Sequence, residues 1–158
     1  MSRQYDPDEL RSLIRLTLID FGHWSEEAEE LILGTIAHES HLGKYRRQVG
    51  GGPALGICQM EPATEIDCWG NYLAYHPDLS VAIKRISGIL GPNKAALENN
   101  DKYAILMCRV KYMRSKLAIP HADDLEAQAE YWFHIYNGSG DVEKVTQYMA
   151  DYHYLVSK

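Results

Sequence analysis

The segment from Ser25 to Ser40 most constrains this chain, because it has the pattern of a single helix whose apolar stripe ends in a carboxylate. Ser25 is a favourable N-cap, and the glutamates that follow it suit the positive end of a helix dipole. Ile32, Ile36 and Glu39 follow at i, i+4 and i+7, which places them on one face. Burial disfavours the charged form of a carboxyl, so we expect a raised pKa for Glu39 and a proton-donating role.

The same helical rhythm of apolar residues recurs along the chain and predicts an all-α fold. Asp6 can cap a first helix, Pro7 suits its first position, and Gly22 ends it. Other helices are expected near residues 78–90, from residue 101 to Pro120, from about residue 125, and from residue 141. The expected inward-facing residues are Leu79, Ile83, Ile86 and Leu90; Tyr103, Leu106, Val110, Met113 and Leu117; Leu125, Ala129, Trp132, Phe133 and Tyr136; and Val142, Val145, Met149 and Tyr152.

A glycine-rich stretch at residues 41–61 interrupts this rhythm. It contains Gly43, Gly50, Gly51, Gly52, Pro53 and Gly56, which are typical of a loop or a small β-hairpin within residues 41–60. A long loop inside a compact domain is usually functional. We therefore expect the loop after Glu39 to form one side of a cleft.

Length and charge narrow the class of protein. The chain has 158 residues, which predicts a single domain over residues 1–158. Its net charge is −6, and no basic cluster stands out beyond Arg46 and Arg47. Because binding to nucleic acid needs a basic patch, we expect no nucleic-acid partner.

The cysteines and the N-terminal residues predict where the chain is made. Cys58, Cys68 and Cys108 are odd in number and form no Cys-x-x-Cys motif, which favours reduced thiols and a cytosolic fold. The first residues contain no apolar run typical of a signal peptide, and no apolar stretch approaches the ~18 residues that a bilayer requires. We expect neither a signal peptide nor membrane insertion.

Three short blocks resemble the active-site signature of soluble lytic transglycosylases and their goose-type lysozyme relatives. That signature consists of Glu-Ser, a loop, Gly-Leu-Met-Gln, then Pro-x-Thr, and finally Tyr-Asn-Ala-Gly. The blocks occur here in the same order, over the segment from about Ile36 to Gly140. The first is Glu39-Ser40, the second is Gly56-Ile57-Cys58-Gln59-Met60 together with Pro62-Ala63-Thr64, and the third is Tyr136-Asn137-Gly138-Ser139.

The resemblance implies a lysozyme-like helical domain with a cleft, and a role for each matched residue. Glu39 would protonate the glycosidic oxygen and then act as the base. Gln59 would hold the sugar or order a water molecule. Tyr136 and Asn137 would line the cleft and contact Glu39 or the substrate, while Ser40 would support the substrate-binding site from behind.

The resemblance also implies a substrate and a product. The substrate would be peptidoglycan, cleaved at the MurNAc–GlcNAc β-1,4 bond. Glycosidases normally use two carboxyls, and substrate-assisted enzymes are the exception. In this family the N-acetyl group or the C6 hydroxyl of the muramoyl sugar acts as the internal nucleophile, and the product carries a 1,6-anhydro end.

The chain departs from the family pattern in four places. Cys58 stands where methionine is usual, and the usual loop serine is not evident around Gln48-Val49-Gly50. The loop from Glu39 to Gln59 is about two residues longer than usual. Tyr-Asn-Gly-Ser replaces Tyr-Asn-Ala-Gly. These differences bear on the sugar subsites and not on the acid.

Two other functions remain open at this point. A muramidase of the same fold would use Glu61 or Asp67 as a second carboxylate and would release a reducing end. A glycan-binding or virion structural module would keep the scaffold without catalysis.

Other residues suggest further roles. His38 and His41 flank Glu39, but their spacing differs from that of a zinc helix motif, and we expect them at the surface or the rim of the cleft. We expect no metal and no other cofactor. Trp69, in what looks like an irregular stretch, is the better candidate for a sugar platform, and Trp132 is expected in the core. Cys58 is not expected to be a nucleophile.

The compact form is typical of a bacteriophage endolysin. Such a protein would be made in the host cytoplasm and would act on the periplasmic cell wall. A holin-like pore formed by a second protein would then deliver it to its substrate.

Overall fold

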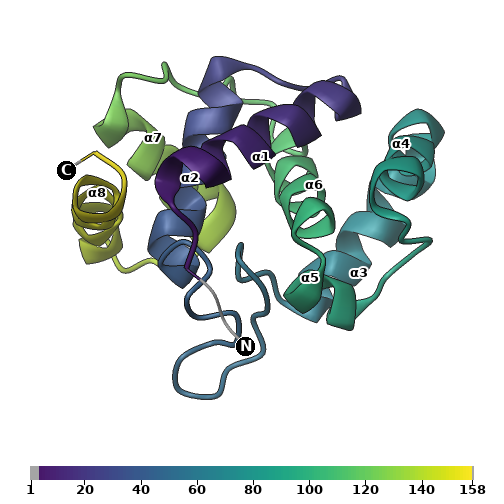
Figure 1. Cartoon of the computed structure of the whole chain (residues 1–158), viewed down its shortest axis with the longest axis horizontal. Coiled ribbons are helices and arrows are strands. Elements are labelled where there is room, and N and C mark those ends of the chain that lie inside the picture. Colours follow the sequence, from purple (N-terminus) through teal and green to yellow (C-terminus); the bar gives the residue numbers. More distant parts are fainter. Residues whose placement is uncertain (1–3, 158) are drawn as a thin grey trace.

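The computed structural model describes residues 4–157, and this part of the chain is all-α (Figure 1). A short 3₁₀ turn, η1 (Leu73–Tyr75), joins α3 to α4, and a π-helical turn, η2 (Phe133–Asn137), continues α7. The α-helices are α1 (Pro7–Phe21), α2 (Glu26–Ser40), α3 (Pro62–Asn71), α4 (Pro77–Ser87), α5 (Lys94–Asn99), α6 (Asp101–Met113), α7 (Leu125–Trp132) and α8 (Glu143–Leu155).

The ends of α1 and the start of α2 confirm the predicted helix signals. The Asp6 side chain accepts hydrogen bonds from two backbone N–H groups of the first turn, and Gly22 ends α1 in the left-handed conformation at φ 80°. The Ser25 side chain accepts from the Ala28 N–H at the start of α2. Local capping chemistry therefore fixes these boundaries.

Helix α2 is the central helix of the larger part of the core. It packs against α1, α6, α7 and α8, and residues 31–37 are buried on every side. Gly34 allows α8 to approach closely, because a Cβ there would lie 2.2 Å from the Tyr148 hydroxyl oxygen. That hydroxyl donates to the Leu31 carbonyl over 3.1 Å.

The hydrophobic core consists of two clusters that share α6. Ala104, Ile105, Cys108 and Tyr112 of α6 belong to the cluster around α1, α2, α7 and α8. Tyr103, Leu106, Met107 and Val110 belong to the cluster around α3, α4 and α5. Figure 1 shows the two groups of helices on opposite sides of α6.

Several predicted elements need correction. Helices α3 and α5 were not expected. The predicted 78–90 helix ends at Ser87 and the predicted 101–120 helix ends at Met113. Leu90 and Leu117, expected to face inward, are therefore outside helices and 76% and 67% exposed. Val142 is also exposed, and the buried residue of α8 is Tyr148. Asn100, rather than Asp101, caps α6.

The expected β-hairpin is reduced to two isolated antiparallel bridges, Arg47 with Leu55 and Leu55 with Met60. Between these bridges the stretch has the conformation of a loop, because its glycines adopt left-handed backbone angles that do not continue a strand. No strand is present within residues 4–157.

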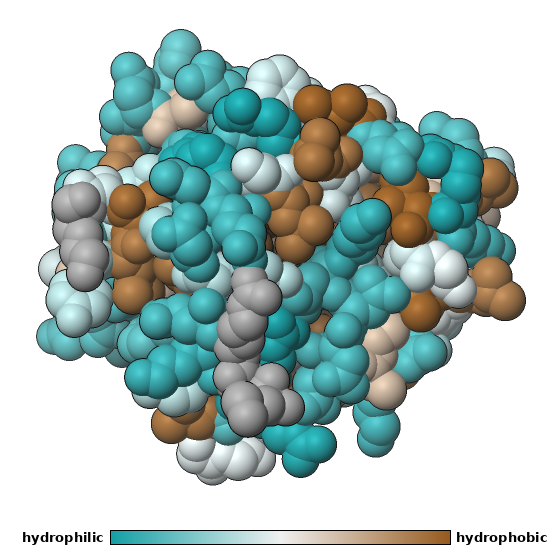
Figure 2. All heavy atoms as spheres, in the orientation of Figure 1, coloured by the Kyte–Doolittle hydropathy of each residue, from teal (hydrophilic) through white to brown (hydrophobic). Residues whose placement is uncertain are grey.

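The face shown in Figure 2 is largely hydrophilic, and the hydrophobic residues that reach it are scattered. No helix in the described part of the chain is both long and apolar enough to cross a membrane.

Candidate active site

Glu39 lies in the last turn of α2 and lines a cleft of about 480 Å³. Segments that are distant in the sequence form this cleft: the loop after α2, the start of α3, α6, η2 and the start of α8. Its lining residues include Gln59, Glu61, Thr64, Lys111, Asn137 and Lys144. The fold thus gathers all three sequence blocks around one carboxyl.

The environment of Glu39 favours its protonated form. Burial raises the pKa of Glu39 to about 7, although the Trp132 hydrogen bond and the charges of Lys111 and Lys144 act in the opposite direction. The Trp132 Nε1–H donates to Oε2 of Glu39 over 3.1 Å. The predicted rise in pKa is therefore confirmed, and the carboxyl can donate a proton near neutral pH.

Two lysines in the cleft were not predicted from the sequence. The Lys111 Nζ donates to the Tyr136 carbonyl over 2.7 Å and lies 4.2 Å from the centroid of the Tyr136 ring. Lys144 lies on the α8 side of the same cleft. Lys111 continues a buried face with Ala104 and Cys108 at i, i+4 and i+7, the same pattern that singled out Glu39.

The long loop is fixed to α6 by an arginine. Both Nη atoms of Arg46 donate to the Asp101 carboxylate, over 2.6 and 2.9 Å, and Nη1 also donates to the Glu98 carbonyl. The Arg46 carbonyl in turn accepts from the Gly56 N–H over 2.6 Å. A bidentate pair of this kind holds the loop in one position across the cleft.

Gln59 lines the cleft as expected, but its amide nitrogen faces the loop. Nε2 donates to the carbonyls of Tyr45, Arg46 and Gly56 over 3.0–3.2 Å. Backbone acceptors therefore occupy this nitrogen, and the predicted contact of Gln59 with a sugar or a water molecule stays a prediction for the rest of the amide. The side-chain oxygen is the atom that remains for a ligand.

Ser40 is fully buried and does not line the cleft. Its hydroxyl donates to the Ile57 carbonyl over 2.7 Å and accepts from the Gly43 N–H over 2.9 Å. This position agrees with a supporting role behind the site and does not place the hydroxyl in contact with a substrate. The side chain instead ties the end of α2 to both ends of the loop.

Tyr136 and Asn137 lie on η2 at the cleft, as predicted. The Tyr136 hydroxyl, however, donates to the Cys58 carbonyl over 2.7 Å and not to Glu39. Asn137 Oδ1 accepts from the Ser139 N–H over 3.0 Å. The predicted contact between Tyr136 and Glu39 is wrong, because the tyrosine ring points into the core and closes the loop against η2.

The backbone at the cleft is unusual in two respects. The non-glycine residues of the described chain with positive φ are His41, Leu42 and Gln59, at 52°, 60° and 48°, and all three belong to the loop that follows Glu39. The other wall of the cleft is a π-helical turn. Strained backbone and π-helical turns both concentrate at functional sites.

The structure separates the two candidates for a second carboxylate. Glu61 is exposed and lines the cleft together with Glu39. Asp67 lies outside the cleft, where Asn71 and Arg114 hydrogen-bond to it and hold its pKa below the ordinary value. Of the two, only Glu61 is placed to act beside Glu39.

The remaining candidates lie elsewhere or have structural roles. Trp69 is on α3 rather than in an irregular stretch, and its indole donates to the Tyr103 hydroxyl over 2.9 Å, so the predicted sugar platform is not part of the cleft. Trp132 is fully buried, as expected. Cys58 is buried, and burial raises the pKa of its thiol far above the ordinary value.

The histidines beside Glu39 point away from the cleft. His38 Nδ1 pairs with Asp151 over 2.8 Å, and His41 Nε2 lies 4.0 Å from the same carboxylate. Among the residues that the structure describes, no three His, Cys, Asp or Glu side chains come together closely enough to hold a metal ion.

Two flanking hollows share lining residues with the cleft. One, toward α3 and α6, shares Thr64 and Lys111 and continues to Arg114 and His134. The other, toward α5, shares Gln48. Each of the two hollows therefore borders the cleft that contains Glu39, although they share no lining residue with each other.

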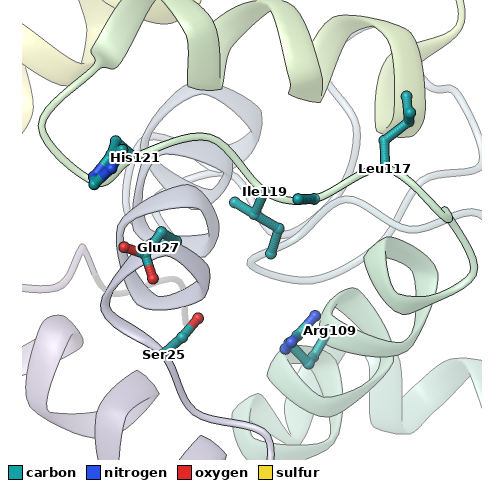
Figure 3. Close-up of a pocket in the computed structure, with 7 residues that line it drawn as sticks. Ser25, Glu27, Arg109, Leu117, Ile119 and His121 are labelled. Carbon is teal, nitrogen blue, oxygen red and sulfur yellow. The ribbon is translucent and has the colours of Figure 1, made fainter.

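A separate hollow of about 480 Å³ lies between the start of α2, α6 and the connection that precedes α7 (Figure 3). Arg109 projects into it from α6, with Glu27 on the α2 side and His121 on the connection. The Arg109 Nε already donates to the His23 carbonyl over 3.0 Å. The hollow shares no lining residue with the cleft, and none of the predicted site residues lies in it.

Comparisons of the chain with protein-family models, with curated protein sequences and with solved structures gave no match.

Proposed function

We propose that this protein cleaves peptidoglycan at the MurNAc–GlcNAc β-1,4 bond, with Glu39 as the single acid and base and a 1,6-anhydro sugar as the product. The observation that carries the proposal is a carboxyl with a pKa of about 7 inside a cleft that also holds Gln59, Tyr136 and Asn137. A carboxyl that is protonated near neutral pH is what protonation of a glycosidic oxygen requires.

The proposed reaction needs no water and no cofactor. Glu39 gives its proton to the glycosidic oxygen as the bond to the anomeric carbon breaks. The C6 hydroxyl of the muramoyl sugar then attacks that carbon and returns its proton to the Glu39 carboxylate, which restores the starting state. The N-acetyl group can hold the anomeric carbon between these two steps.

The shape of the site supports a polymeric substrate. Two further hollows border the cleft, one through Gln48 and the other through Thr64 and Lys111, and they offer room for sugars beyond the cleaved bond. General acid catalysis contributes roughly 10²–10⁴-fold to a rate. The remainder would come from sugar binding and distortion in the cleft.

Clearing of purified sacculi tests the proposal. Glu39→Gln keeps the shape of the side chain and removes the titrating proton, so the rate should fall by at least ~10²-fold while the melting curve remains that of a folded protein. A near wild-type rate in this variant would rule out the mechanism.

A muramidase is the second candidate, because Glu61 lines the same cleft. If the enzyme is a transglycosylase, Glu61→Gln should cost less than about tenfold, well short of a lost acid or base. A loss as large as that of Glu39→Gln, together with a reducing-end product, would instead identify a hydrolase.

A glycan-binding or virion structural module is the third reading, and it predicts retention of glycan strands by the wild-type protein without turnover. As an enzyme, the protein would serve phage-mediated lysis of a host cell. A membrane pore made by another protein would then be its route to the wall.

A further inference from the structure

The Lys111 side chain extends from a buried face of α6 into the cleft. The residue lies one and two turns beyond the buried residues Cys108 and Ala104, and its half-buried side chain reaches the cleft beside Glu39. Lysine is rarely placed on a buried helix face without a partner for its charge. The contacts of the Lys111 ammonium group therefore indicate its role.

The ammonium group is positioned, but its donors are not all used. Nζ donates to the Tyr136 carbonyl over 2.7 Å and lies 4.2 Å from the centroid of the Tyr136 ring. Both contacts favour the charged form, and they oppose burial, which lowers the pKa of Lys111. An ammonium has three N–H donors. In the described part of the chain no ion pair joins Lys111 to a carboxylate, unlike the arginines at positions 11, 15, 46 and 114.

The location of Lys111 connects it to the substrate rather than to the fold alone. Lys111 and Thr64 line both the cleft and the adjoining hollow. Arg114 and Asp67 also line that hollow, and because they pair with each other over 2.7 Å, Lys111 is its unpaired cation among the lysines and arginines that line it. A strand that leaves the cleft in this direction passes the ammonium group. Lys144 adds a second positive charge on the α8 side of the cleft.

The carboxyls near Lys111 do not cancel its charge. Glu39 is about half protonated at pH 7, because burial raises its pKa to about 7. Glu61 is exposed, so water and salt screen its charge. Two lysines thus face one half-protonated and one exposed carboxyl, so the cleft lacks the negative charge of a protein whose overall charge is −6.

We infer that Lys111 is a specificity-determining residue, whose remaining N–H donors bind a carboxylate carried by the glycan strand next to the bond that Glu39 cleaves. The site would thus select acidic strands, such as peptide-bearing or lactyl-bearing glycans, over neutral ones. This inference rests on the proposed function, because it assigns a contact to the glycan in that same cleft.

Calorimetric binding to the inactive Glu39→Gln protein tests the inference without turnover. The probes are peptidoglycan strands that carry free carboxylates, polygalacturonate as an unrelated acidic glycan, and chito-oligosaccharide as the neutral glycan. Adding Lys111→Met should weaken binding of the acidic peptidoglycan strands by about five- to tenfold and change the neutral ligand by less than about twofold. Lys111→Arg should restore most of the loss, since it keeps the charge.

Lys102→Met is the matched control, because Lys102 is exposed on the same helix and does not line the cleft. It should leave both affinities unchanged. If Lys111→Met does not fold, the salt dependence of binding to the Glu39→Gln protein still tests the inference. Raising the salt from about 0.05 to 0.5 M should weaken binding of the acidic strand but not of the neutral one.

The outcomes separate this inference from the proposed function. An equal loss for acidic and neutral ligands, or binding of the acidic strand that ignores both Lys111 and salt, overturns the specificity role. Binding of polygalacturonate that depends on Lys111, with no binding of peptidoglycan strands, supports the acidic-glycan site and contradicts the proposed peptidoglycan substrate. Absence of binding to every acidic glycan overturns both.

Discussion

At the scale of the residue, the half-buried carboxyl of Glu39 lines the cleft and accepts a hydrogen bond from the Trp132 indole, and its partial removal from water makes ionisation cost free energy. Its pKa is about 7 in the folded protein against an ordinary value of 4.5. The folded state therefore binds more protons than the unfolded state between these two values. The stability that the protonated Glu39 carboxyl contributes is fully present below pH ~4.5 and is lost as the pH rises through ~7.

Glu39→Gln should accordingly raise the free energy of unfolding at pH 8 by about 1–3 kcal/mol and change it little at pH 4. Urea unfolding at the two pH values measures the difference. Glu61→Gln is the control, since that side chain is exposed and its removal should give no comparable gain. Equal effects of Glu39→Gln at both pH values would show that the carboxyl is not buried as described.

The indole of Trp132 favours the charged form of Glu39 by donating to it. Trp132→Phe should therefore raise the Glu39 pKa and move the alkaline limb of the pH–rate profile upward by about 0.5–1 pH unit. Trp69→Phe is the matched control, because its indole donates to Tyr103 outside the cleft. A profile that stays in place in Trp132→Phe, or moves equally in the control, would remove Trp132 from the tuning of the acid.

The roles of single residues were predictable where the local sequence pattern indicated them. A carboxylate on the apolar face of α2 was visible from spacing alone. Lys111 has the same spacing on α6 but was missed, because a helical lysine usually lies in water. The partner of Tyr136 could not be predicted, since the Cys58 carbonyl reaches it only through the path of the loop.

At the scale of the element, the π-helical turn η2 and the loop after α2 support each other through the hydrogen bond from the Tyr136 hydroxyl to the Cys58 carbonyl. Removing the donor leaves a buried carbonyl unpaired, which costs about 1–3 kcal/mol. The contact does not involve the Glu39 carboxyl.

Tyr136→Phe should therefore lower Tm by several degrees and leave the pH optimum unchanged. A melting curve measured beside a pH–rate profile tests this. A shifted optimum with an unchanged Tm would instead place the hydroxyl in the chemistry of the acid.

Helix boundaries were predictable where the chain carries strong end signals, as at Asp6, Gly22 and Ser25. Helix α3 was missed because buried Glu65 interrupts its apolar stripe, and that carboxyl is satisfied only by the distant Asn93 N–H and Tyr103 hydroxyl. Helix α5 is six residues long, too short to show a clear period. Long-range contacts, absent from any local window, decide both.

At the scale of the whole molecule, α6, α1 and the loop before α3 contribute residues to both core clusters, and of these elements α6 contributes the most. Cys58 and Cys108 lie in one cluster and Cys68 in the other, and all three thiols are buried. Because α6 contributes to both, we expect the two clusters to unfold together.

Pulsed thiol labelling with mass spectrometry across a urea titration measures this directly. All three cysteines should become reactive with one common midpoint. Labelling of Cys68 at a clearly lower urea concentration than Cys58 and Cys108 would show that the cluster around α3–α5 unfolds on its own.

The all-α class followed from the repeated helical period, but the arrangement of the helices did not. The shape of the cleft depends on how the bidentate Arg46–Asp101 pair places the loop against α6, and on which hollows then border it. Neither feature can be predicted from the periodicity of apolar residues in the sequence. The order of the three motif blocks pointed to one site, and only the fold shows what surrounds it.

Mass spectrometry of the fragments released from purified sacculi tests the central claim most directly. The wild-type protein should release muropeptides that end in 1,6-anhydro sugars, and Glu39→Gln should release almost none. Fragments with reducing ends, or a wild-type protein that releases nothing, would contradict a single-glutamate transglycosylase.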